Sequence, residues 1–266
     1  MVASDFPVFL LLTVVMGFSI FLGLPVIYST RAQGRWAVAL NAAAIGILIF
    51  LAADVFSDVA GLIYPGGSYV ANPGYAIAFA LAFTVAYAGL YFVDNLPRGS
   101  LLGASDATTG PENGPRRTAM IIALGIGLQN LTEGLVFGGN WAAGSLGVLA
   151  VVFLGFFLQN MTEGFPIASP FLGTGAPRNI ALMVGLFLVG GIPTVVGGAL
   201  GYFWTNTLLL VIFDALAIGA IVFVILPMLR VAFRPLENRA ASLARNRLVY
   251  AGVLVGFVIG FAVNAI

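Results

Sequence analysis

Eight apolar segments, each long enough to cross a lipid bilayer, follow one another along this chain of 266 residues. A crossing takes about 20 residues of α-helix, because every backbone polar group in the hydrocarbon must be paired within the segment itself. The segments lie at residues 7–28, 36–57, 75–93, 118–138, 146–169, 179–203, 207–229 and 248–265. The sequence therefore predicts an all-α polytopic membrane protein with one transmembrane domain, residues 1–266.

The composition supports this class and excludes others. Hydrophobic residues make up 61% of the chain and charged residues 8%, whereas a soluble domain carries about 25% charged residues. Cysteine and histidine are both absent, which excludes disulfides and metal sites built from thiolate or imidazole. A net charge of +1 gives no basic surface for nucleic acid. The first segment has no basic residues before it and is too long for a signal peptide, so we interpret it as a retained span.

The basic residues alternate between connections, which tests the count of eight independently. All eleven are arginines, and they fall only in the first, third, fifth and seventh connections: 31, 35, 98, 116, 117, 178, 230, 234, 239, 245 and 247. The positive-inside rule then predicts cytoplasmic odd connections and both termini outside the plasma membrane. The longest connection, residues 94–117, is polar and expected to be disordered.

One polar signature occurs twice within this apolar sequence. Leu-Gln-Asn-x-Thr-Glu-Gly occupies residues 128–134 and again residues 158–164. A carboxylate inside a membrane segment is energetically costly and usually functional. The two copies supply six candidate metal ligands: Gln129, Asn130, Glu133, Gln159, Asn160 and Glu163.

Helical geometry places the glutamine and the asparagine of each copy on the same face as its glutamate, from which they lie four and three positions away. The fourth and fifth segments run antiparallel through the connection 138–147. With the turn centred near Ala143, Glu133 and Gln159 lie at depths of about 15 and 24 Å, so the copies overlap only loosely. If they meet, the carboxylates and amide oxygens suit one or two divalent cations.

A purely structural role is the alternative for the same residues. A lone amide in a membrane helix is more often a hydrogen bond between helices than a ligand, but the duplication on adjacent helices favours ligands. Thr132 and Thr162 are expected to bond to backbone or to a neighbouring helix, and Gly134 and Gly164 to permit close packing.

The two signatures resemble the fourth- and fifth-helix motifs of the ZIP (Zrt-, Irt-like) metal transporters, nearest the GufA-like prokaryotic branch. That branch reads His-Asn-x-Pro-Glu-Gly and Gln-Asn-x-Pro-Glu-Gly at these places. The resemblance extends to eight spans, external termini and a long third connection. It implies a 3+2+3 bundle, in which spans 1–3 and 6–8 form an inverted repeat around helices four and five.

The resemblance also implies a two-metal centre. Gln129, Glu133, Gln159 and Glu163 would hold one ion, and Asn130, Asn160 and the two glutamates a second. The chain departs from the family where Gln129 replaces histidine and threonine replaces the proline before each glutamate. It also has Gly191-Ile192-Pro193 in place of Val-Glu-Pro, and Leu226-Pro227 where a seventh-helix glutamate is common. With oxygen ligands alone, the preference for Zn²⁺ weakens relative to Mn²⁺, Fe²⁺ or Mg²⁺.

Three aspartates are candidates for an entry path. Asp54 and Asp58 lie at the outer end of the second segment, where a solvated helix end is the alternative for Asp58, and Asp214 lies in the outer third of the seventh. Pro166, Pro193 and Pro227 are expected to break or kink their helices.

These features predict a carrier, not an enzyme, that moves a divalent metal cation (Zn²⁺, Mn²⁺, Fe²⁺ or similar) inward across the plasma membrane by alternating access. No cofactor is expected. The expected partners are the metal ion and the lipid bilayer, with a homodimer left open and no nucleic acid. Two alternative functions remain open. One is a transport-inactive or metal-sensing relative of the ZIP transporters, and the other is a proton or organic-cation carrier that uses the paired glutamates.

Overall fold

The computed structural model describes residues 6–28, 34–68, 70–94, 113–142, 146–172, 179–204, 206–233 and 239–265, and within these ranges all regular structure is helical. The helices are α1 (Phe6–Phe18), η1 (Ser19–Gly23), α2 (Pro25–Tyr28), α3 (Arg35–Ile63), η2 (Pro65–Gly67), α4 (Pro73–Asp94), α5 (Asn113–Ala142), α6 (Leu146–Ala168), η3 (Ser169–Phe171), α7 (Ile180–Phe203), α8 (Thr207–Ala232) and α9 (Arg239–Asn264). Seven helical segments, all of the long ones except α6, are long and apolar enough to cross a membrane. The chain is therefore a multi-pass membrane protein, as predicted.

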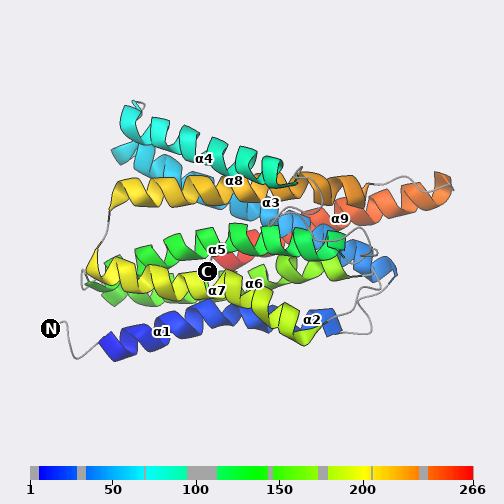
Figure 1. Ribbon diagram of the computed structural model, residues 1–266, viewed down its shortest axis with the longest axis horizontal. Helices are drawn as coiled ribbons and strands as arrows, with labels where there is room; N and C mark the ends of the chain where they lie inside the picture. Colours follow the sequence, from blue (N-terminus) through cyan, green and yellow to red (C-terminus); the bar gives the residue numbers. More distant parts are fainter. Residues whose placement is uncertain are drawn as a thin grey trace.

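The helices form two layers (Figure 1). In one layer, α3 packs against α8 and α9, and α4 packs against α8. In the other layer, α5 packs against α6 and α7, and α1 packs against α6 and α7. The layers meet where α8 contacts α5 and where α3 and α9 contact α6. Each signature, on α5 or α6, thus lies in the layer that also contains α1 and α7.

Several predicted boundaries are wrong. In each case the helix either extends beyond the predicted apolar segment or is divided within it. The second segment continues to Ile63, well beyond residue 57, and the last begins at Arg239 instead of 248. The added turns of α9 are polar and rich in arginine, whereas those of α3 are mostly apolar and bury Val59 and Ile63 against other helices. The first segment is not one helix: α1 ends at Phe18 and the chain continues as the 3₁₀ helix η1.

The third connection is also shorter than predicted. α5 begins at Asn113, so Arg116 and Arg117 lie in its first turns and not in a loop; residues 95–112 of this connection lie outside the described ranges. The three prolines do not break their helices, since α6, α7 and α8 each continue through Pro166, Pro193 and Pro227.

Local signals fix the other helix ends. Asn179 and Asn206 accept backbone N–H groups at the starts of α7 and α8, which satisfies donors that have no partner within the helix. Gly66 and Gly67 adopt positive φ between α3 and α4, a conformation that favours glycine. At the far end of α8, Arg245 of α9 donates to the carbonyls of Val231 and Ala232.

Candidate metal site

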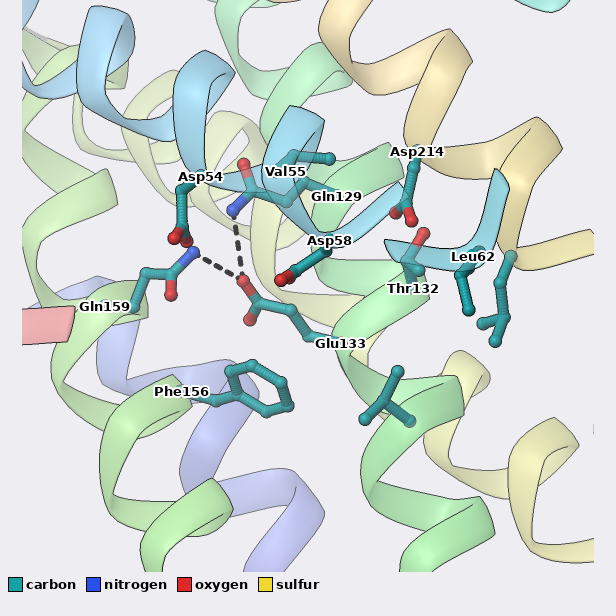
Figure 2. A pocket seen from close by; sticks show the side chains of 12 residues that line it. Asp54, Val55, Asp58, Leu62, Gln129, Thr132, Glu133, Phe156, Gln159 and Asp214 are labelled. Carbon is teal, nitrogen blue, oxygen red and sulfur yellow. Dashed lines mark hydrogen bonds between the residues drawn. The ribbon is translucent and has the colours of Figure 1, made fainter. Parts of the chain in front are cut away.

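The two signatures meet at Glu133. Its Oε1 accepts one hydrogen bond from Nε2 of Gln159, at 2.7 Å, and another from Nε2 of Gln129, at 3.1 Å (Figure 2). Gln159 Nε2 also lies 3.5 Å from Oε1 of Glu163. The structure therefore brings α5 and α6 together at the predicted residues, and more closely than the depth calculation indicated.

Buried oxygens without a hydrogen-bond partner surround this contact. All six signature residues are buried, and Asn130, Asn160 and Glu163 are 0% exposed. Five of their oxygens have no hydrogen-bond donor among the described residues: Gln129 Oε1, Asn130 Oδ1, Glu133 Oε2, Asn160 Oδ1 and Glu163 Oε2. A buried polar atom without a partner costs about 1–3 kcal/mol. Five such atoms beside two carboxylates form a donor set that suits a hard cation.

The two asparagines are anchored through their nitrogens. Asn130 Nδ2 donates to the carbonyl of Gly190 in α7 at 3.0 Å, and Asn160 Nδ2 donates to the carbonyl of Met16 in α1 at 3.1 Å. These backbone acceptors were not predicted, because every residue has a carbonyl and the sequence does not distinguish those that accept a side-chain hydrogen bond. Only the neighbouring glycines, which let helices approach closely, could have indicated them.

The threonines and glycines of the signatures have the predicted structural roles. Thr132 and Thr162 hydroxyls donate to backbone carbonyls of their own helices. A Cβ on Gly134 would collide with the carbonyl of Thr194, and one on Gly164 with backbone of η1. Both glycines therefore permit close packing.

The three predicted entry-path aspartates line one cavity with the signature residues. The cavity has a volume of about 320 Å³ and lies between the two layers. Asp54, Asp58 and Asp214 come from α3 and α8, while Gln129, Glu133 and Gln159 come from α5 and α6. Figure 2 shows the carboxylates of Asp54, Asp58 and Glu133 pointing into the same space.

Asp58 is exposed and lines the cavity, and α3 continues for more than one turn beyond it, to Ile63. Asp214 is 5% exposed and lies beside Thr132, a lining residue that the sequence did not indicate (Figure 2). The remaining wall is apolar and was not predicted: Val55, Leu62, Val136, Phe156 and Leu210. Asn130, Asn160 and Glu163 do not line the cavity and lie deeper in the protein.

Carboxylates alone do not make a metal site here. Among the described residues, no three acidic side chains lie close enough together to hold an ion. A cation at this place would need the amide oxygens as well. No arginine is among the described residues that line the cavity, so a cation would meet no positive side chain there. Ile192 and Leu226 are 43% and 51% exposed and are not among the described residues that line the cavity.

Neither protein-family models nor curated proteins give a match to this chain.

Proposed function

We propose that this protein is a ZIP-like carrier that moves a divalent metal cation across the plasma membrane. The observation that supports the proposal best is the meeting of the two Gln-Asn-x-x-Glu motifs, which leaves five buried oxygens without partners around Glu133 and Glu163. Two negative charges and neutral oxygen ligands match a dication. The donor set favours Mn²⁺, Fe²⁺ or Mg²⁺ over Zn²⁺, because zinc prefers nitrogen or sulfur ligands.

The position of the cavity supports an outward-facing arrangement of the site. Leu62 is near the end of α3 and Leu210 is near the start of α8, at the ends that carry no arginine. At the opposite, arginine-bearing ends, buried apolar residues such as Ile122, Phe171 and Met183 fill the space. By the positive-inside rule the cavity opens outward and the cytoplasmic side is closed. An ion would enter from outside and leave inward after the layers rearrange.

The packing pattern supports an inverted repeat. In such a repeat, α1, α3, α4 and α5 would correspond to α7, α8, α9 and α6, in that order. The contact between α3 and α9 then has its counterpart in the contact between α8 and α4. The contact of α5 with α7 likewise corresponds to that of α6 with α1 and η1. Such a repeat places the site near its pseudo-two-fold axis, which is where carriers of this type bind their substrates.

Uptake into proteoliposomes tests the proposal. The wild type should accumulate at least one of Mn²⁺, Fe²⁺, Zn²⁺, Co²⁺, Cd²⁺ and Mg²⁺, and Glu133→Gln should not. Asn140→Ala is the matched control, because Asn140 is an amide on α5 that donates to the carbonyl of Val136 in its own helix and is not among the described residues that line the cavity. If no metal is taken up by the wild type, or Glu133→Gln transports normally, the proposal is wrong.

One observation favours a second candidate, a carrier of small organic cations. The cavity of about 320 Å³ is much larger than a bare ion, and Phe156 lies beside the carboxylates. An aromatic face attracts a cationic ammonium group. Uptake of a labelled primary amine that no metal inhibits would support this candidate over the metal carrier.

A further inference from the structure

The α5 signature packs on α7 through two carbonyls. Asn130 donates to the carbonyl of Gly190, and Gly134, one turn later, lies against the carbonyl of Thr194. An asparagine and a glycine four residues apart on α5 therefore face two carbonyls four residues apart on α7.

The α6 signature packs on the first helix in the same way. Asn160 donates to the carbonyl of Met16, and Gly164 lies against the carbonyl of Ile20 in η1. The spacing of four residues is again the same on both partners. Each signature thus combines its polar residues with an Asn-x-x-x-Gly packing surface.

The two partner helices cross each other beside these carbonyls. A Cβ on Gly17 would lie 2.6 Å from the carbonyl oxygen of Gly191, and a Cβ on Gly191 would lie 2.5 Å from that of Gly17. Real Cβ atoms do not approach so closely, so only glycine fits at either position. Gly17 follows Met16 and Gly191 follows Gly190, which places both anchoring carbonyls at this crossing.

We infer that Gly17 and Gly191 are positioning residues of the proposed metal site, because their contact at the crossing of α1 and α7 sets the carbonyls of Met16 and Gly190 that hold the Asn160 and Asn130 amides. Because the Nδ2 atom of each amide donates to a carbonyl, the Oδ1 atom is the one that remains to bind an ion. Both Oδ1 atoms are buried and accept no hydrogen bond. The inference rests on the proposed function, and it makes Gly17 and Gly191 positioning residues that never touch the ion.

The test is Gly191→Ala, with Gly185→Ala as the matched control on the same helix. A Cβ on Gly185 would meet nothing within 4 Å. Apparent dissociation constants for Mn²⁺, Mg²⁺ and Ca²⁺ come from the rise in unfolding temperature of purified protein during titration. Loss of a hydrogen-bond partner that orients a metal ligand typically weakens metal binding about 10–100-fold. We expect that loss for Mn²⁺ in Gly191→Ala and none in Gly185→Ala.

The ratio of Mg²⁺ to Ca²⁺ affinity separates positioning from general destabilisation. Mg²⁺ requires near-ideal octahedral ligands, whereas Ca²⁺ tolerates irregular ones, so displaced Oδ1 atoms should lower Mg²⁺ affinity more. Unchanged Mn²⁺ affinity and an unchanged ratio in Gly191→Ala would overturn the inference while leaving the proposed function in place. A wild type that binds no metal would overturn both.

If Gly191→Ala does not fold, Asn130→Ala and Asn160→Ala provide the test, since they remove atoms and introduce no clash. Ligation predicts that both variants lose at least tenfold in Mn²⁺ affinity. If instead both unfold at a lower temperature without metal but bind Mn²⁺ as the wild type does, the asparagines only connect helices and the inference is wrong.

Discussion

The Glu133 carboxylate has one oxygen with two hydrogen bonds and one oxygen with none. Oε1 accepts both glutamine amides, and Oε2 is buried without a partner. Two donors on one oxygen fix the orientation of the group. The second oxygen is then available to a cation, and Gln129 and Gln159 act first as supports for this carboxylate. This dual role was not evident in the sequence, where all three residues were equivalent ligand candidates.

A first prediction separates the charged ligands from the neutral ones. Glu133→Gln removes a full negative charge from a buried site, and we expect at least a 100-fold loss of Mn²⁺ affinity, equivalent to about 2.8 kcal/mol. Gln159→Ala removes a neutral group that bonds to Glu133, and we expect a smaller loss, about tenfold. Equilibrium binding of ⁵⁴Mn²⁺ to purified protein measures both. Equal losses in the two variants would contradict this division of roles.

A second prediction concerns selectivity at residue 129. Gln129 Oε1 is buried, and the side chain lines the cavity. Gln129→His would offer an imidazole nitrogen, which favours Zn²⁺ over Mn²⁺ or Mg²⁺ by about tenfold or somewhat more. The gain should disappear about one pH unit below 6.5, because a protonated imidazole cannot bind a metal. Competition binding of Zn²⁺ against Mn²⁺ or Mg²⁺, measured above and below this pH in the wild type and in Gln129→His, tests the prediction. An unchanged ranking of metals would mean that residue 129 does not contact the ion.

At the scale of the elements, the sequence predicted which segments are helical but not how they end or approach one another. Hydropathy locates the hydrocarbon-spanning part of each helix and says nothing about polar turns beyond it, so α9 was predicted too short. The end of α3 was placed too early, just before Asp58, although apolar residues follow it to Ile63. The predicted depths of Glu133 and Gln159 follow from the rise of the helix backbone alone and leave out the length of the side chains. Long side chains such as Gln159 bridge the remaining offset, which is about 6 Å when measured from the observed helix ends.

A third prediction concerns the approach of α6 to η1. A Cβ on Gly164 would collide with the carbonyl of Ile20, so Gly164→Ala should lower the free energy of unfolding by about 1–3 kcal/mol. Gly155→Ala lies on the same helix and meets nothing within 4 Å, so it should be neutral or gain up to about 1 kcal/mol from reduced backbone freedom in the unfolded chain. Thermal unfolding in detergent without metal compares the two, and equal stabilities would show that η1 can move aside.

At the scale of the whole molecule, the candidate site lies between two helix layers, and each layer supplies a different set of polar residues. α5 and α6 supply the signature residues, and α3 and α8 supply Asp54, Asp58 and Asp214 across the cavity. The sequence identified all three aspartates because charge in an apolar segment is conspicuous. It could not identify the apolar wall, since Val136 or Leu210 looks like any other membrane residue until the layers are in place.

A fourth prediction tests which side of the membrane the cavity faces. Val136 and Ile126 lie on the same helix, but Val136 lines the cavity and Ile126 is fully buried in the apolar cluster toward the arginine-bearing end. The chain has no native cysteine. In intact cells, Val136→Cys should react with a membrane-impermeant thiol reagent and Ile126→Cys should not. A bound divalent cation should slow the reaction of Val136→Cys, because the ion and the reagent would occupy the same cavity. Reaction of Val136→Cys only after the cytoplasmic side is exposed would reverse the orientation derived from the arginines.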